Sequence, residues 1–124
     1  MEMKLFDSEL KVMDALWKAG GDLPAGQIAK ILKEETGWNR NTTYTVIKKC
    51  IAKGAVERRD PKFICHALVT RKQVQNYETG ELIDKMFDGS KQKFFAAFLS
   101  DSDLTSEEVM QLKEMISGLS GREL

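Results

Sequence analysis

The chain has 124 residues, 42% of them hydrophobic and 31% charged, which fits one domain or one domain with a small appendage. No run approaches the roughly 18 consecutive apolar residues that a membrane span needs. The start, Met1-Glu2-Met3-Lys4, lacks the charged-then-apolar pattern of a signal peptide. These features argue against a membrane-spanning protein, and we expect a cytoplasmic protein with no stable membrane association.

The formal net charge of zero hides an uneven distribution. Residues 1–72 carry 14 Lys and Arg against 9 Asp and Glu, whereas residues 73–124 carry 5 against 10. Residues 38–62 contain seven basic residues but only two acidic ones. The pattern indicates a basic half that meets a polyanion such as nucleic acid, although chance variation in charge along the chain explains it equally well at this point.

The apolar residues of the first third recur at helical spacing. They predict a first helix over 7–19 and a second over about 25–36. Asp7 or Ser8 is expected to cap the first helix, and Gly20-Gly21 to end it.

A third helix is expected over about 40–53, after Asn39, which is a favourable N-cap residue. Its predicted buried stripe is Thr43, Val46, Ile47, Cys50 and Ile51. The opposite face is mostly polar: Asn41, Thr42, Thr45, Lys48, Lys49 and Ala52, with Tyr44 on the flank. Three short helices with tight turns, the third polar on its outer side, predict a helix-turn-helix.

Residues 55–69 alternate as a β-hairpin. Its turn is expected at Asp60-Pro61-Lys62, and the returning strand places Cys65 on its apolar face. A basic hairpin after a polar third helix is the candidate wing. We expect Cys65 and Cys50 to be buried thiols in a reducing cell, because a metal site needs more ligands than these two and His66 supply.

The last third is predicted to be helical. A helix is expected over about 71–88, and a shorter one over about 91–99. The sequence Thr105-Ser106-Glu107-Glu108 is a capping box for a last helix, which is expected to fray at Gly118 and Gly121.

Three helices in about 50 residues cannot easily form their own core, so their apolar residues predict a dimerisation module. The residues expected at a dimer interface are Tyr77, Ile83, Met86, Phe87, Phe94, Phe95, Phe98, Leu112, Ile116 and Leu119. The alternative, an intrachain core, stays open for some of them, and Phe94 or Phe95 fits it. The predicted organisation is a winged helix-turn-helix domain over 1–70 and a helical dimerisation module over 71–124, mainly α with a small β wing.

Six segments in chain order carry a family resemblance: Glu9-Leu10-Lys11-Val12-Met13-Asp14-Ala15-Leu16-Trp17, Leu23-Pro24-Ala25-Gly26-Gln27-Ile28, Trp38-Asn39-Arg40-Asn41-Thr42-Thr43-Tyr44-Thr45-Val46-Ile47-Lys48-Lys49, Lys53-Gly54-Ala55-Val56, Phe87-Asp88-Gly89-Ser90 and Asp103-Leu104-Thr105-Ser106-Glu107-Glu108-Val109. Together they resemble the penicillinase-repressor family of bacterial winged-helix regulators (the BlaI/MecI type). The chain departs from that pattern at Leu10, where the family has Trp, at Pro61-Lys62, where it has Gly-Arg, and at Cys65, where it has Tyr. The departures concern the wing's contacts more than the fold.

The resemblance implies a sequence-specific transcriptional repressor, of a family linked to antibiotic resistance, that binds a palindromic double-stranded operator as a homodimer. It implies no cofactor. Copper-responsive members carry Cys-x-Cys pairs near the C-terminus, and no cysteine follows Cys65, which excludes copper sensing by that route. β-Lactam-responsive members are cleaved at an Asn-Phe bond that aligns with Ala97-Phe98, so relief through a sensor-protease antirepressor stays open.

The polar helix face and the resemblance together predict the DNA contacts. An Asn amide bonds adenine through two hydrogen bonds, and Thr and Tyr bond phosphates or base edges. The residues expected in the major groove are Asn41, Thr42, Tyr44, Thr45 and Lys48. The residues expected at phosphates are Arg40, Lys49, Lys53, Arg58, Arg59 and Lys62. For each of them the alternative is a merely solvated surface.

No enzyme is expected. The single histidine, His66, has no Cys, Ser or carboxylate at motif spacing, and the sequence has no zinc motif or phosphate-cradling glycine loop. The serious alternative is a protein-interaction adaptor that binds no operator, since winged helices also bind proteins. Retention on an operator duplex would distinguish the two.

Overall fold

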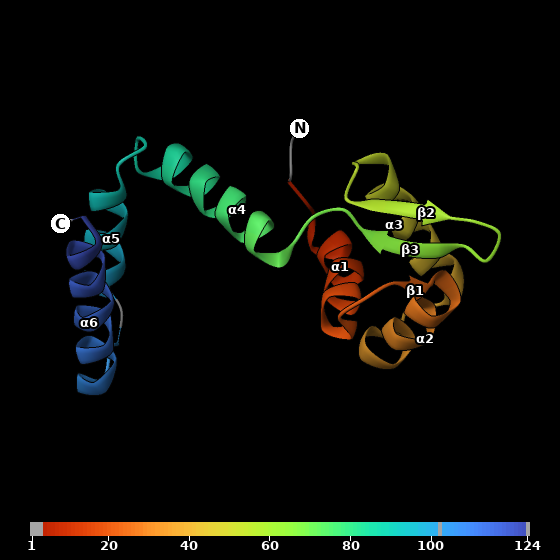
Figure 1. Cartoon of the computed structure of the whole chain (residues 1–124), viewed down its shortest axis with the longest axis horizontal. Helices are drawn as coiled ribbons and strands as arrows, with labels where there is room; N and C mark the ends of the chain where they lie inside the picture. Colours follow the sequence, from red (N-terminus) through yellow and green to blue (C-terminus); the bar gives the residue numbers. More distant parts are fainter. Residues whose placement is uncertain (1–3, 102, 124) are drawn as a thin grey trace. The chain divides into compact units, whose positions relative to one another are not determined.

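The computed structural model describes residues 4–101 and 103–123. It divides into two compact units, one ending at Leu82 and one beginning at Ile83. In chain order the elements are α1 (Asp7–Ala19), β1 (Leu23–Pro24), α2 (Ala25–Thr36), α3 (Arg40–Ala52), β2 (Val56–Arg59), β3 (Ile64–Ala67), α4 (Arg71–Met86), α5 (Lys91–Asp101) and α6 (Ser106–Glu123). The predicted fold class, mainly helical with a small β wing, is confirmed (Figure 1).

Three helices build the core of the first unit. α1, α2 and α3 pack against one another, and each contributes fully buried side chains, among them Met13, Ile28 and Ile47. These residues lie on the apolar stripes from which the helices are predicted. The predicted bounds of the first two helices are confirmed, and the third ends at Ala52 instead of about residue 53.

A small antiparallel sheet of order β1-β3-β2 completes this unit. Cys65 of the central strand lies opposite Leu23 of β1 and opposite Arg58 of β2. The hairpin is also fixed to the start of α2, because the Ala25 N–H donates to the Phe63 carbonyl oxygen over 3.0 Å. The wing is therefore attached to the helical core at its base and near its turn.

The start of α1 differs from the expectation, because neither Asp7 nor Ser8 caps the helix. The N-cap residue is Phe6, and its N–H donates to the Glu9 carboxylate over 2.8 Å. Asp7 and Ser8 already have helical conformation, so a carboxylate from the third helical position satisfies the backbone donor instead.

Both cysteines are buried and free, as predicted. Burial, with a smaller contribution from the Glu9 charge, raises the pKa of the Cys50 thiol to about 12. Burial also raises the pKa of the Cys65 thiol to about 11. Both thiols are therefore protonated at neutral pH and act as small apolar core groups.

Of the helices beyond the wing, α4 ends at Met86, before the expected residue 88, whereas α5 and α6 are longer than the sequence indicates. α6 continues to Glu123 through Gly118 and Gly121, where fraying was expected, and that expectation is wrong. A helical glycine costs about 1 kcal/mol relative to alanine, which weakens a helix without having to end it. The Thr105 capping box is confirmed: the Glu108 N–H donates to the Thr105 hydroxyl over 3.1 Å, and the Thr105 N–H donates to the Glu108 carboxylate over 3.0 Å.

α4 begins on the core of the first unit. Val74, in the first turn of this helix, is 3% exposed and belongs to that core. The domain boundary expected at 70/71 therefore precedes α4, whereas the division between the compact units falls inside it. Within the described residues, no helix is long and apolar enough to cross a membrane.

Candidate nucleic-acid interface

The buried stripe of α3 determines which side chains it presents to solvent. Four of the five residues of the predicted stripe are buried in the core, namely Thr43, Val46, Ile47 and Cys50, and the fifth, Ile51, is half-buried against it. The Asn39 side chain caps the helix by accepting from the Thr42 N–H over 2.8 Å. Five exposed side chains of the helix form the face that we call the recognition face: Asn41, Thr42, Thr45, Lys48 and Lys49.

The hydroxyl of Thr45 is already used inside the helix. It donates to the Asn41 carbonyl oxygen over 2.9 Å. This hydrogen bond uses the one donor of the hydroxyl, so its acceptor lone pairs and the methyl group remain for an outside contact, and the methyl group can pack on a thymine methyl.

The seven basic residues of 38–62 differ in whether an acid neutralises them. Three form ion pairs with carboxylates: Lys53, Arg58 and Arg59. The other four have no acidic partner among the described residues: Arg40, Lys48, Lys49 and Lys62. Three of these four lie on α3 and one lies in the turn of the hairpin, so the uncompensated positive charge is concentrated on the helix.

Of these seven basic residues, Lys53 is held by contacts with α1 and with the segment before it. Its ammonium lies 2.6 Å from the Glu9 carboxylate, which is 1% exposed, and it donates to the Lys4 carbonyl oxygen over 3.1 Å. It also lies 3.9 Å from the centre of the Phe6 ring. A lysine with these partners connects the end of α3 to the start of α1 and has little freedom to approach a phosphate.

The two hairpin arginines are held by neighbours on the same hairpin. Arg58 donates to Asp60 over 2.9 Å, and Arg59 donates to Glu57 over 2.7 Å. Arg59 also reaches Asp22 over 3.2 Å. The hydrogen bond that Arg59 donates to Glu57 raises the pKa of Arg59 above its usual value.

Tyr44 lies at the border between the recognition face and the wing. It is half-buried, and its hydroxyl accepts a hydrogen bond from Arg40 over 2.8 Å. Its ring meets the Phe63 ring edge-on, with the centroids 5.6 Å apart. Sequence reasoning missed Phe63 as a functional residue, although an aromatic residue directly after a basic turn could have signalled a contact with the helix.

The residues expected at a dimer interface fall into two groups by exposure. The first group is buried or half-buried: Tyr77, Ile83, Phe87, Phe94 and Leu112. The second group is exposed: Met86, Phe95, Phe98, Ile116 and Leu119. In the second unit the Phe94 ring contacts the rings of Phe87 and Phe95, each with centroids 5.5 Å apart. All five residues of the exposed group belong to this unit and are large apolar side chains that intrachain packing leaves open to solvent.

The Ala97-Phe98 bond lies inside α5, so both residues have helical backbone. Ala97 is half-buried and Phe98 is 40% exposed. A protease that cuts extended chain would therefore reach this bond only after local opening of the helix.

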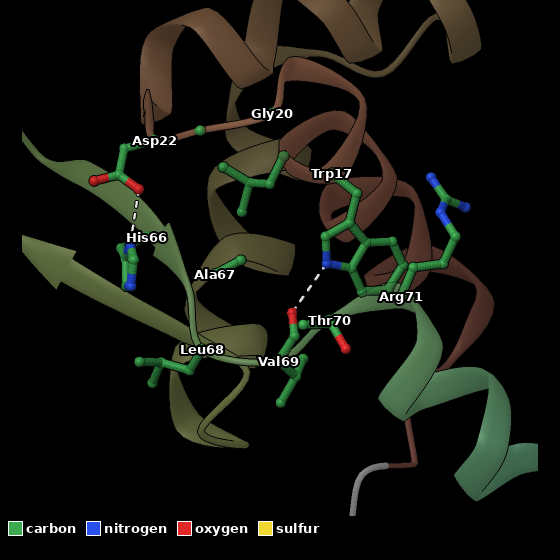
Figure 2. A pocket seen from close by; sticks show the side chains of 11 residues that line it. Trp17, Gly20, Asp22, His66, Ala67, Leu68, Val69, Thr70 and Arg71 are labelled. Carbon is green, nitrogen blue, oxygen red and sulfur yellow. Dashed lines mark hydrogen bonds and ion pairs between the residues drawn. The ribbon is translucent and has the colours of Figure 1, made fainter.

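A cavity of about 420 Å³ lies away from the recognition face, between the end of α1 and the sheet. Figure 2 shows the hydrogen bond between His66 Nδ1 and the Asp22 carboxylate, 2.7 Å long, on one side of it and the Trp17 indole on the other. The Trp17 N–H donates to the Val69 carbonyl oxygen over 3.0 Å. The first contact joins β3 to the loop after α1, and the second joins α1 to the segment after β3. Among the described residues, no group of three His, Cys, Asp or Glu side chains could hold a metal.

Three packed helices with an exposed polar third helix, followed by an antiparallel hairpin, define a winged helix-turn-helix protein. The family model described as "Penicillinase repressor" matches residues 5–118, and the chain belongs to this family. It is similar to the penicillinase repressor of Bacillus licheniformis, with 21% identity over 91% of this chain and 89% of that one. It is also similar to the methicillin resistance regulatory protein MecI of Staphylococcus aureus (strain N315), with 22% identity over 92% of this chain and 94% of that one.

The solution structure of the DNA-binding domain of the repressor BlaI supports the fold assignment. It superposes with a TM-score of 0.52 and 23% sequence identity, covering 57% of this chain and 88% of that domain. The predicted winged-helix fold and the predicted family are both confirmed.

Proposed function

We propose that this protein is a cytoplasmic transcriptional repressor that binds double-stranded operator DNA and is not an enzyme. The observation that carries the proposal is the recognition face, a polar helix surface that stays exposed because the apolar stripe behind it is buried. The family membership and the names of the relatives support the same function.

In this proposal α3 lies in the major groove. Asn41, Thr42, Tyr44, Thr45 and Lys48 meet base edges, and Thr45 does so through its methyl group. Arg40, Lys49, Arg58, Arg59 and Lys62 meet phosphates, which fix the register of the protein on the duplex. The uncompensated charge of Arg40, Lys49 and Lys62 supports this division. Arg58 and Arg59 are paired with carboxylates and would meet phosphates through their further guanidinium N–H donors.

The proposed active form is a homodimer on a palindromic operator. Exposed apolar side chains of the second unit support it, since Phe95, Ile116 and Leu119 are 53%, 58% and 57% exposed. Burying such side chains against a second copy removes apolar surface from water. Two linked DNA-binding units also bind far more tightly than one, so a signal that separates them relieves repression.

Proteolysis at Ala97-Phe98 by a sensor-protease is the proposed form of that signal. The bond lies in a helix of the second unit, so a cut would remove part of the proposed dimer surface together with α6. Incubation with a candidate sensor-protease from the neighbouring genes, followed by mass spectrometry, would locate the cut. If the protein releases its operator after this incubation while the Ala97-Phe98 bond stays intact, cleavage at this bond is excluded as the signal.

DNA binding is tested by enriching duplexes from a random-sequence library on the purified protein and then footprinting the enriched sequence. We expect a palindromic site with two half-sites protected. Thr45→Ala or Asn41→Ala should lower discrimination between that site and random duplex by about 1–3 kcal/mol. Lys30→Ala, which removes an exposed lysine of α2, is the matched control and should leave discrimination unchanged.

Two outcomes of these experiments would contradict the proposal. If no sequence is enriched and random duplex is not retained, the winged helix serves as a protein-interaction adaptor. If a site is enriched but the α3 variants discriminate as the parent does, the recognition face has been assigned to the wrong surface.

A further inference from the structure

Phe63 has an unusual backbone conformation for its residue type. Its φ is +50°, in the left-handed region that L side chains other than Asn and Asp rarely adopt. The surrounding contacts hold it there: its carbonyl oxygen accepts from the Ala25 N–H over 3.0 Å. Strained residues of this kind persist where the neighbouring structure fixes them, and they cluster at functional sites.

The ring of Phe63 joins the wing to the recognition helix. Its edge-on contact with Tyr44 has centroids 5.6 Å apart and an interplanar angle of 90°. The guanidinium carbon of Arg58 lies 3.8 Å from the centre of the same ring. One half-buried ring therefore contacts a side chain of α3 and a side chain of β2 at once.

Each end of this arrangement carries a guanidinium. At the α3 end, Arg40 donates to the Tyr44 hydroxyl over 2.8 Å, and its guanidinium lies 4.8 Å from the Tyr44 ring centre. At the wing end, Asp60 accepts from Nε of Arg58 over 2.9 Å. Since a guanidinium has five N–H donors, the four on the terminal nitrogens of Arg58 remain for a ligand. We call the series Arg40, Tyr44, Phe63 and Arg58 the aromatic strut.

We propose that Tyr44 and Phe63 are positioning residues for DNA binding, which fix Arg58 of the wing relative to Arg40 of the recognition helix so that both guanidiniums meet phosphates. The proposal rests on the proposed function, because it presumes that the protein binds DNA. Arginine loses much side-chain freedom when it forms a fixed contact, and a guanidinium already stacked and hydrogen-bonded has lost part of that freedom before DNA arrives.

The test measures the coupling between Phe63 and Arg58 on the enriched duplex, by fluorescence anisotropy over a series of salt concentrations. In the parent, Arg58→Ala should weaken binding about fivefold at 0.15 M salt and reduce the slope of log affinity against log salt by about 1.8, because each protomer of the dimer loses one contact. Phe63→Leu should cause a similar loss, and Arg58→Ala in that background should then cost less than about twofold. Phe63→Tyr keeps the ring and should restore parental binding.

Arg59→Ala is the matched control. Arg59 belongs to the same strand but pairs with Glu57 and Asp22, outside the strut. Whatever effect Arg59→Ala has in the parent, it should have the same effect in the Phe63→Leu background. An Arg58→Ala penalty that is equally large with and without the Phe63 ring would overturn the inference while leaving the proposed function intact.

Two further outcomes are distinguished in advance. If the parent retains no duplex, the proposed function fails and the strut has no role in DNA binding. If Phe63→Leu unfolds the protein, Tyr44→Phe replaces it, since this change keeps both rings and removes only the acceptor for Arg40. The Arg40→Ala penalty should then shrink at least about twofold in the Tyr44→Phe background, and an unchanged penalty would overturn the inference.

Discussion

The ion pair between Glu9 and Lys53 predicts an asymmetric response to mutation. The Glu9 carboxylate is 1% exposed and receives two hydrogen bonds, from the Phe6 N–H and from the Lys53 ammonium, over 2.8 and 2.6 Å. The Lys53 side chain is 30% exposed, so water reaches it from one side. Removing the lysine therefore leaves a buried charge unpaired, whereas removing the carboxylate's charge leaves a lysine that water can solvate.

We expect Lys53→Met to lower the free energy of unfolding by about 3 kcal/mol, the lower end of the range for a buried charge that loses its partner. Glu9→Gln should cost about 1–2 kcal/mol, because the amide oxygen still accepts from the Phe6 N–H. In the Glu9→Gln background, Lys53→Met should cost less than about 1 kcal/mol, because no buried charge remains to be compensated.

Urea denaturation followed by tryptophan fluorescence measures these values. Both tryptophans, Trp17 and Trp38, lie in the first unit, so the signal reports the unfolding of the unit that contains the ion pair. Lys48→Met is the matched control and should change stability by less than about 0.5 kcal/mol, since Lys48 is exposed. Equal costs for Glu9→Gln and Lys53→Met, adding without coupling in the double variant, would refute the reasoning.

Three further predictions use other parts of the structure. Because burial raises the pKa values of the Cys50 and Cys65 thiols to about 12 and about 11, neither thiol of the folded protein should react with iodoacetamide at pH 8, and rapid labelling of the folded protein would contradict this prediction. Above about pH 9 the thiols of the unfolded chain lose their protons before those of the folded protein, so the free energy of unfolding in denaturation curves should fall as the pH rises. Gly26→Ala should raise the free energy of unfolding by up to about 1 kcal/mol, since its Cβ would meet the nearest atoms at 3.6 Å, an ordinary contact, and a destabilised variant would show that α2 has no such room. Ile116→Glu should convert the protein from a dimer to a monomer in sedimentation experiments, whereas Met110→Glu, on another face of α6, should leave the dimer intact. A parent protein that sediments as a monomer would contradict the proposed dimer.

Local patterns in the sequence predict the helices of the first unit and part of the site. The stripe of α3 and the Asn39 cap depend on residues within one or two turns, so periodicity and capping rules find them. The same rules place the cap of α1 wrongly, because the residue that satisfies the Phe6 N–H is Glu9. That carboxylate is held in place by Lys53, a partner 44 residues away that helical periodicity does not indicate.

Charge counting in the sequence also overstates the free positive charge. Seven basic residues in 38–62 look equivalent, but the fold brings carboxylates to three of them, and two of those carboxylates, Glu9 and Asp22, lie outside the segment. The aromatic strut is hidden from the sequence for the same reason, because Tyr44 and Phe63 meet only when the hairpin folds against α3.

The ion pair of Lys53 gives a number that DNA binding can test. The proposal places five cations of each protomer at phosphates and leaves out Lys53, which pairs with the buried Glu9 carboxylate: Arg40, Lys49, Arg58, Arg59 and Lys62. At about −0.9 per contact, the proposed dimer should show a slope of log affinity against log salt of about −9. If Lys53 also contacted a phosphate, the slope would be about −11.

Lys53→Met should leave the slope unchanged, whereas Lys49→Ala should reduce it by about 1.8 for the dimer. A slope near −11 that falls on mutation of Lys53 would mean that the protein breaks its buried ion pair to bind DNA, and the assignment of Lys53 to the fold would then be wrong.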